Sequence, residues 1–213
     1  METTGKSAWT EITDVEQLED LIGTPLQRVR DKVRPALHEL DRAWLEAAPF
    51  CLVATSDTDG NCDVSPKGDP AGRLAYVIDD TTIAIAERPG NRRVDGYRNI
   101  LSNPHVGLIF LIPGRPDTLR VNGRARLVSD AEFFDRMEVK GHRPVLALVV
   151  EIDEVFHHCA KAFLRSRLWE PDSWQDPVPS RAEIAKQLER PDASMEELAV
   201  YYGEQYRTKL YSA

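Results

Sequence analysis

The sequence predicts a mainly β fold, an antiparallel, closed sheet of about six to seven strands with flanking helices. Seven segments with the alternation of strands follow one another between residues 50 and 156. Only one segment of helical length, Arg93–Ser102, interrupts them, so the strand–helix alternation that builds a parallel sheet is missing. A chain of 213 residues can bury about 70% of its unfolded surface, so a stable core is expected.

Helices are expected before the sheet. Asp14 begins a capping-box pattern and Gly23 supplies a stop signal, which together predict a helix over Val15–Leu21. Thr24 gives a second start signal. The apolar residues at helical spacing after it are Val29, Val33, Leu37, Leu40 and Trp44. Pro35 lies inside this pattern and is expected to kink or split the helix.

The strands are separated by turn sequences. An Asp-Gly pair at residues 59 and 60 is a hairpin signal between the first two strands. The expected strands are Phe50–Thr55, Asn61–Pro66, Arg73–Ile78, Thr82–Ala86, His105–Ile112, Thr118–Val128 and Pro144–Phe156.

The second strand has two unlike faces. Side chains alternate across a strand, so Cys62 and Val64 share one face while Asp63, Ser65 and Lys67 share the other. The apolar face is expected to point into the core and the polar face away from it.

The strand Thr118–Val128 alternates over its whole length. Its apolar face carries Leu119, Val121, Gly123, Ala125 and Leu127, and its polar face carries Arg120, Asn122, Arg124 and Arg126. Such a polar face must be solvated or bound to an anion. A wet outer face is common in antiparallel sheets, so both interpretations stay open.

The segment Glu87–Arg93 lies between the end of a strand and the start of a helix. Gly90 lets the backbone approach a ligand, and a helix N-terminus offers free N–H groups. Arginine adds forked donors that match phosphate oxygens. A phosphate site fits here, although an arginine-rich surface loop is the alternative because no Walker or Rossmann glycine pattern is present.

Charge is unevenly distributed along the chain. The formal net charge of -8 argues against a general nucleic-acid binder, because affinity for phosphate backbones depends on a basic surface. Between Arg88 and Arg126, however, eight arginines stand against two aspartates. A single arginine-rich stretch in an otherwise acidic chain indicates a compact anion-binding site.

No membrane span is predicted. The longest apolar run, Val106–Ile112, is far shorter than the roughly 20 residues that a membrane helix needs. Residues 1–13 lack the apolar stretch of a secretory signal, so a cytoplasmic protein is expected.

Metal and hydrolase sites have little support. The three cysteines form no CxxC pair, which makes a disulfide framework or a cysteine zinc site improbable. His157, His158 and Cys159 are adjacent on a strand and point to alternating faces, so a structural or ligand-facing role fits them better than metal binding. No serine lies in a GxSxG context.

Several spaced motifs carry a family resemblance. They are Phe50–Thr55 with its Asp-Gly turn, Asp63–Asp69, Arg88–Arg93, Arg98–Pro104, Thr118–Ala125 and His158–Ala162. In this order the motifs resemble the pyridoxamine 5'-phosphate oxidase-like flavoproteins of the FMN-binding split-barrel class, over Thr24–Trp174. The resemblance implies an FMN-binding split β-barrel and a homodimer, with each FMN in a groove between two subunits.

The resemblance also implies roles for individual residues. Ser65 and Lys67 would contact the flavin ring or ribityl chain, with Lys67 as a donor near the N1 and C2 carbonyl edge. An ordinary surface lysine is the alternative for Lys67. The implied phosphate grip consists of Arg88, Asn91, Arg92 and Arg93.

The remaining implied contacts come from the neighbouring strand and from the partner subunit. Asn122 with Arg120 or Arg124 would line the groove from the neighbouring strand. Lys161 of the partner would lie near the flavin. Trp169 would form a wall or stacking surface, and a core role for it is equally compatible with the sequence.

The tail departs from true pyridoxamine 5'-phosphate oxidases. It lacks their Arg-Leu-His-Asp-Arg type of segment, which helps to bind the vitamin phosphate, so activity on pyridoxamine phosphate is not expected. Residues 174–213 indicate instead a proline-rich loop and two helices, starting at Ser180 and Ser194.

These observations predict one domain in three parts: N-terminal helices packing on the barrel over residues 1–48, the FMN-binding split β-barrel over 49–170, and a C-terminal loop and helices over 171–213. The expected function is an FMN-dependent oxidoreductase on an unidentified small molecule, without nucleic-acid or membrane partners and without a metal. One alternative is a non-catalytic flavin, deazaflavin or haem binding or sensing protein of the same fold. Another is a dimeric structural protein whose basic face meets an acidic partner.

Overall fold

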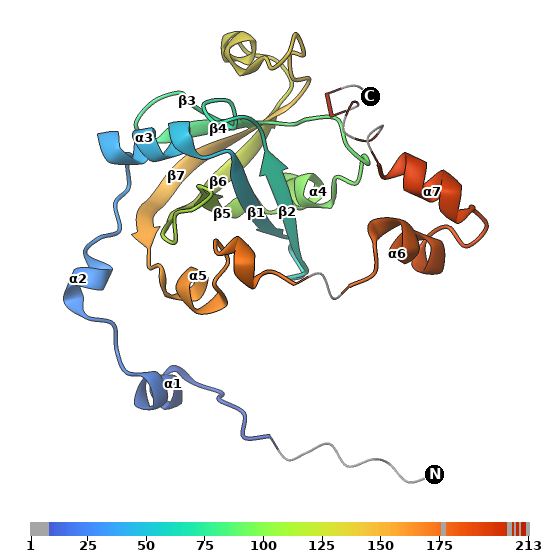
Figure 1. Ribbon diagram of the computed structural model, residues 1–213. Helices are drawn as coiled ribbons and strands as arrows, with labels where there is room; N and C mark the ends of the chain where they lie inside the picture. The colour runs from blue at the N-terminus through green and yellow to red at the C-terminus, as the bar shows by residue number, and fades with distance from the viewer. Residues whose placement is uncertain (1–8, 176–177, 204–205, 207, 209, 212–213) are drawn as a thin grey trace. The chain divides into compact units, whose positions relative to one another are not determined.

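The computed structural model describes residues 9–175, 178–203, 206, 208, 210 and 211 (Figure 1). The chain divides into two compact units, Met1–Val33 and Arg34–Ala213. The first unit contains the helices α1, Val15–Ile22, and α2, Gln27–Arg30, and neither buries a residue.

The helix starts follow local hydrogen-bonding chemistry. Asp14 caps α1 as expected, because its Oδ1 accepts the Gln17 backbone N–H at 2.9 Å. The start expected at Thr24 is wrong, since α2 begins after Leu26 and has no side-chain cap. The long helical pattern is split, as Pro35 predicts: α2 ends at Arg30 and α3 spans Glu39–Ala47.

Seven strands form one sheet in the second unit. They are β1 (Phe50–Ser56), β2 (Cys62–Gly68), β3 (Ala75–Val77), β4 (Thr82–Ala86), β5 (His105–Leu111), β6 (Thr118–Val128) and β7 (Ala147–His158). Their order is β2-β1-β5-β6-β7-β4-β3, and every neighbouring pair is antiparallel. The mainly β, antiparallel fold is therefore confirmed. The sheet is nevertheless split rather than closed, because β2 and β3 remain as edges.

The sheet curls around its core. Helix α4, Asp95–Ser102, packs against β1, β2 and β6 although two strands separate β2 from β6 in the sheet order. The apolar face of β6 is buried at Leu119, Val121 and Ala125, as its alternation predicts. Burial of such side chains supplies most of the driving force for this curvature.

One glycine is required by a close approach of two strands. The register between β6 and β7 shifts between Asn122 and Gly123. A Cβ on Gly123 would lie 2.0 Å from the carbonyl oxygen of Glu151, which is closer than any side chain can approach. The irregularity in β6 therefore depends on the absence of a side chain at this position.

Short helical elements follow β7 in the described part of the chain. They are α5 (Lys161–Ser166), the 3-10 helix η2 (Pro171–Ser173), α6 (Arg181–Leu188) and α7 (Met195–Tyr201). Both predicted starts are confirmed, because Ser180 forms a capping box with Glu183 and Ser194 accepts the Glu197 backbone N–H. None of the helices in the described part of the chain combines the length and hydropathy that crossing a membrane requires.

Candidate functional site

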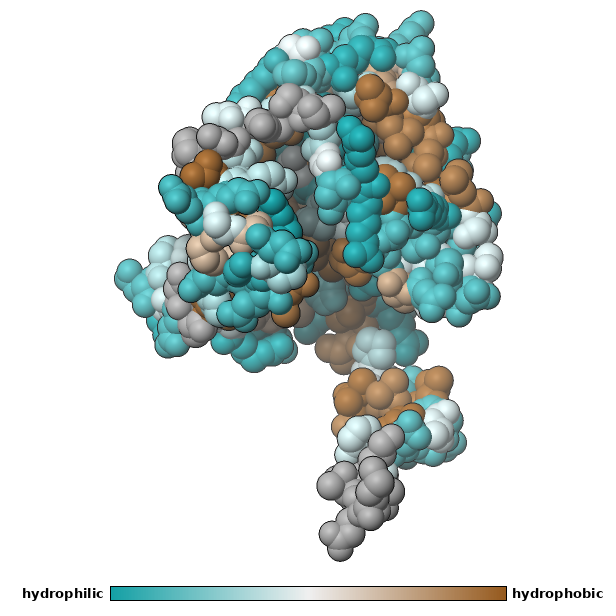
Figure 2. Space-filling view, turned by 90° about the vertical axis from the view of Figure 1, so that its right-hand side faces the viewer, coloured by the Kyte–Doolittle hydropathy of each residue, from teal (hydrophilic) through white to brown (hydrophobic). Residues whose placement is uncertain are grey.

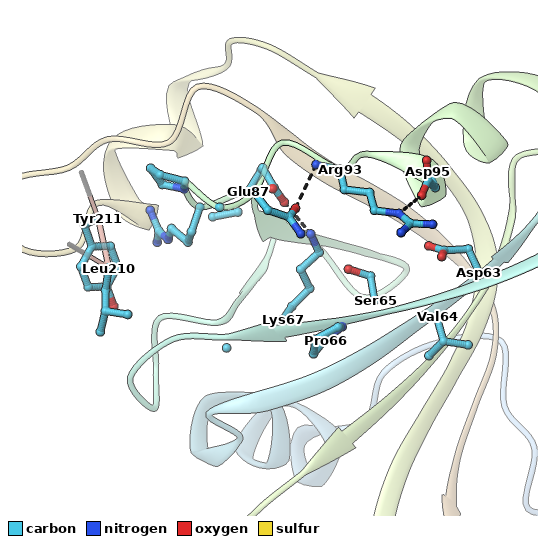
Figure 3. A pocket seen from close by; sticks show the side chains of 16 residues that line it. Asp63, Val64, Ser65, Pro66, Lys67, Glu87, Arg93, Asp95, Leu210 and Tyr211 are labelled. Atoms are coloured by element: carbon cyan, nitrogen blue, oxygen red, sulfur yellow. Dashed lines mark hydrogen bonds and ion pairs between the residues drawn. The ribbon is translucent and has the colours of Figure 1, made fainter. Parts of the chain in front are cut away.

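A cavity of about 560 Å³ lies beside the edge strand β2 (Figure 3). It is formed by β2, the loop between β4 and α4, and two residues near the C-terminus. The lining residues are Asp63–Gly68, Ala86–Asn91, Arg93, Asp95, Leu210 and Tyr211.

The faces of β2 are oriented opposite to expectation. Asp63, Ser65 and Lys67 are half-buried, while Cys62 is exposed and Val64 is 57% exposed. Figure 3 shows Ser65 and Lys67 on the side of the loop and Val64 turned away. The expectation that the apolar face points inward was wrong. Alternation separates two faces but does not say which one is enclosed, and here a polar cavity encloses the polar face.

Lys67 belongs to a hydrogen-bonded cluster with Glu87 and Tyr97. Its Nζ lies 2.5 Å from Glu87 Oε2 and donates to the Tyr97 hydroxyl at 3.0 Å, and that hydroxyl in turn donates to Glu87. Burial, with the hydrogen bond to Glu87, raises the pKa of Tyr97 well above its usual value. The Lys67 side chain is only 14% exposed, so it is not an ordinary surface lysine.

The cluster leaves the ammonium group with spare donor capacity. A lysine carries three N–H donors, and Glu87 and Tyr97 occupy two of them. The third can face the cavity that Lys67 lines. Lys67 is thus a donor held in place at the cavity wall. Its expected contact with a flavin stays a prediction.

Arg88 is held by the protein itself. Its Nε donates to Asp69 Oδ2 at 2.8 Å, and its two terminal nitrogens donate to the carbonyl oxygens of Met137 at 2.7 Å and His142 at 3.4 Å. The Asp69 side chain is only 2% exposed and also accepts the hydroxyl of Tyr211 at 3.0 Å. Arg88 therefore fixes the wall of the cavity, and few of its donors remain for the phosphate that it was expected to grip.

The other three residues expected to bind the phosphate do not all line the same cavity. Asn91 and Arg93 line the cavity, and Asn91 Oδ1 accepts the Arg93 backbone N–H at 2.9 Å. The Arg93 guanidinium is 78% exposed and pairs with Asp95. Arg92 does not line this cavity but an adjoining second one, which shares residues 87–91 with the first.

The polar face of β6 lies outside the cavity. Strands β1 and β5 stand between β2 and β6, so β6 is not the neighbouring strand that was expected. Arg120 Nε lies 3.4 Å from Asn122 Oδ1, and Asn122 Nδ2 donates to Glu154 Oε2 at 2.8 Å. Arg124 is exposed. Within one chain these residues are not brought to Ser65 and Lys67.

Lys161 and Trp169 also lie apart from the cavity. Lys161 is exposed at the start of α5. Trp169 is half-buried, donates its Nε1 hydrogen to the carbonyl oxygen of Arg115 at 2.7 Å, and stacks on Phe163. Trp169 therefore packs locally on Phe163 and is not among the buried core residues, and its expected role as a wall for the flavin stays a prediction.

Sequence reasoning missed Glu87, Tyr97, Asp69 and Tyr211 as components of the site. The sequence did offer a signal for two of them. Glu87 is an acidic residue directly after the buried strand β4, and Tyr97 lies one turn before Ile100 on the buried face of α4. Asp69 and Tyr211 offered no signal, because 142 residues separate them in the sequence.

The adjacent histidines contact structural groups. His157 Nε2 lies 3.2 Å from Asp41 Oδ1, and its ring meets Trp44 edge-on at 5.1 Å between centroids. Among the described residues, no three His, Cys, Asp or Glu side chains converge as metal ligands would.

Comparison with known proteins identifies the family. Residues 37–159, more than half of the chain, match the family Pyridoxamine 5'-phosphate oxidase. The chain belongs to this family, and its split antiparallel sheet agrees with the split-barrel fold. No curated protein matches the chain.

Solved structures with a similar fold have low sequence identity. An FMN-binding protein from Syntrophomonas wolfei is 16% identical, with 67% of this chain and 97% of that chain covered and a TM-score of 0.43. HupZ of Group A Streptococcus is 19% identical, covering 57% and 93%, with a TM-score of 0.45. A protein of the pyridoxinephosphate oxidase family from Clostridium acetobutylicum, related to general stress protein 26, is 14% identical, covering 56% and 86%, with a TM-score of 0.42.

Proposed function

We propose that this protein is an FMN-dependent oxidoreductase that acts on a small molecule and binds its cofactor in the cavity beside β2. The observation that carries the proposal is the meeting of Ser65 and Lys67 with the loop ending in Arg93, in one cavity of a chain from this family. The volume of about 560 Å³ lies within the range of roughly 300–1,000 Å³ typical of ligand sites.

The loop end of the cavity fits a phosphate group. Arg93 presents an exposed guanidinium at this end, and Asn91 also lines the cavity. Its present partner, Asp95, forms an exposed ion pair with it, and Asp63 acts on the same guanidinium; exposed ion pairs are weak because solvent screens them. A phosphate dianion can therefore replace Asp95 as the partner of Arg93 at small cost.

The β2 end fits the edge of a flavin ring. Bound FMN would supply two-electron transfer chemistry, for which no side-chain nucleophile is needed. Lys67 would donate its remaining N–H toward the ring edge on which negative charge develops. Glu87 and Tyr97 hold the Lys67 ammonium in place, and Ser65 adds a hydroxyl on the same face of β2.

We also propose a homodimer that completes the cofactor groove. Arg120, Asn122, Lys161 and Trp169 lie outside the cavity of their own chain, so only a second copy can bring such residues to it. The exposed face of the edge strand β2, with Val64 57% exposed, supports coverage by another protein surface. Sedimentation equilibrium should give twice the chain mass, and a monomer would contradict this part of the proposal.

Flavin titration tests the cofactor assignment. The purified protein should be yellow, with a flavin spectrum that is released on denaturation. Arg93→Ala should weaken FMN binding by about 1 to 2 kcal/mol, because it removes a charge-assisted contact at an exposed position. Arg98→Ala, an exposed arginine of α4 that does not line the cavity, is the matched control. A colourless protein that does not bind added FMN would refute the proposal.

A second measurement separates an enzyme from a binding protein. The protein should accept electrons from a nicotinamide cofactor and pass them to an acceptor faster than free FMN does. Flavin binding without such turnover would leave the cofactor assignment intact and refute the oxidoreductase.

A further inference from the structure

The second cavity has a volume of about 890 Å³ and lies next to the first. The two share residues 87–91, Leu210 and Tyr211 as a common wall. Figure 2, which views the molecule from the side of α6 and α7, shows hydrophobic side chains beside a hollow in a largely hydrophilic surface. A cavity of this size can hold a small organic molecule.

Aromatic and aliphatic side chains line the second cavity and are left open to solvent. Tyr201, Tyr206 and Leu210 are each more than half exposed, and Val145 is 81% exposed. Tyr211 adds a third ring, which is anchored by its hydrogen bond to Asp69. Exposed apolar side chains gathered around one hollow mark a binding surface, since each gains free energy when it is covered.

Arg92 supplies a cation to the same cavity. Its backbone adopts φ 62°, a left-handed conformation that costs a non-glycine residue free energy. Among the described residues Arg92 has no hydrogen-bond or ion-pair partner, whereas Arg143, also in the lining, is paired with Asp130 and Asp135. The guanidinium of Arg92 is therefore the one in this wall available for an incoming anion.

The aromatic wall lies outside the residues that the family model matches. Tyr201, Tyr206, Leu210 and Tyr211 all follow residue 159, where the family match ends. The second cavity therefore forms where the C-terminal segment meets the loop that borders the first cavity.

We propose that the second cavity binds a small aromatic anion, with its ring against Tyr201 and Tyr206 and its negative group on Arg92. Aromatic rings favour stacked and edge-on contacts with tyrosine, and a sulfonate or carboxylate matches the forked donors of arginine. In this proposal the occupant lies beside the cofactor, since Arg92, Tyr201 and Tyr206 line the second cavity and not the first. The two cavities adjoin, so competition with FMN tests whether one ligand spans both.

Two fluorescent probes of similar shape test the assignment. 8-Anilinonaphthalene-1-sulfonate carries a negative charge, and N-phenyl-1-naphthylamine is its neutral counterpart. Arg92→Ala should weaken the sulfonate probe about tenfold and leave the neutral probe unchanged. Tyr201→Ala should weaken both probes about fivefold, because both lose an aromatic contact.

Controls on the same protein locate the binding. Arg165→Ala removes an exposed arginine of α5 and should change neither probe. Ser65→Ala, which alters only the first cavity, should also leave both affinities unchanged. Saturating FMN should not displace either probe. The probe affinities are measured without FMN, so they can be interpreted even if the cofactor assignment fails. Thermal melts of each variant exclude unfolding as the cause of a weaker signal.

Two outcomes would overturn the proposal. One is equal affinity of the sulfonate probe for the native protein and for Arg92→Ala. The other is a loss of dimer on sedimentation of Arg92→Ala or Tyr201→Ala, which would assign this face to contacts between copies of the chain.

Discussion

Replacing Arg88 should damage the fold far more than replacing Arg93, although both come from the same arginine-rich loop. Arg88 makes three hydrogen bonds inside the protein, one of them to Asp69, whose side chain is 2% exposed. The Arg93 side chain is 78% exposed, and its guanidinium pairs with the neighbouring carboxylate of Asp95. The structure therefore assigns the two guanidinium groups to different tasks.

The magnitude follows from the charge that each substitution leaves behind. Removing one partner of a buried ion pair costs about 3–5 kcal/mol, because the other charge stays buried without compensation. In Arg88→Ala the hydroxyl of Tyr211 still donates to Asp69, so the lower limit of about 3 kcal/mol is expected. Arg93→Ala breaks a solvent-screened, exposed ion pair and should leave the free energy of unfolding almost unchanged.

Urea denaturation measures the free energy of unfolding of both variants. FMN is left out, because a bound ligand would stabilise the folded state of each variant to a different extent. A loss of 3 kcal/mol should lower the melting temperature by about 6–12 °C for a domain of this size. In the double variant Asp69→Asn with Arg88→Ala, part of the loss should be recovered, since no carboxylate remains unpaired. Equal stability of the Arg88→Ala and Arg93→Ala variants would refute the reasoning.

Three further perturbations test other parts of the structure. Gly123→Ala should destabilise the fold by about 2 kcal/mol or more in urea denaturation, because its methyl group would meet the carbonyl of Glu151 at 2.0 Å; a native-like midpoint would show that β6 has no need of a glycine. Burial raises the pKa of Asp41, but hydrogen bonds from Arg34 and a backbone N–H outweigh it and hold the pKa below its ordinary value. The stability from this carboxylate is thus complete above about pH 3.9 and is lost as the pH falls through the folded pKa; melting temperatures between pH 2 and 7 should slope less steeply for Asp41→Asn, and parallel slopes would contradict this. Burial raises the pKa of the Cys51 thiol to about 12, so iodoacetamide at pH 8 should modify it only after unfolding, as peptide mass spectrometry would show; fast labelling in the folded protein would disprove its burial.

Much of the fold follows from local patterns. The strand Thr118–Val128 was predicted with both of its ends, because apolar and polar side chains alternate from Leu119 to Leu127. The alternation did not predict the register shift against β7 between Asn122 and Gly123. The capped starts at Ser180 and Ser194 are equally local, since each serine accepts the backbone N–H three residues later, and Glu183 completes a capping box with Ser180. Helix α3 was less predictable at its start, where the ring of His38 accepts the N–H of Leu40 in place of a more common capping side chain.

Local sequence patterns predicted only part of the candidate site. Ser65, Lys67, Asn91 and Arg93 share one cavity, as the sequence suggested. The inward direction of the polar face of β2 was misjudged, because burial depends on what covers a strand and not on the composition of the strand itself.

By itself, the sequence determined the strand alternation, the helix caps, the arginine-rich stretch and the family. Only the tertiary structure decided which guanidinium faces which partner. Residues 88, 92 and 93 look alike in the sequence, yet one is held by buried Asp69, one lines a second cavity, and one remains exposed at the first. The reason is physical: the energy of a charge depends on the groups that surround it in space, and those groups come from parts of the chain as distant as Asp69 and Tyr211.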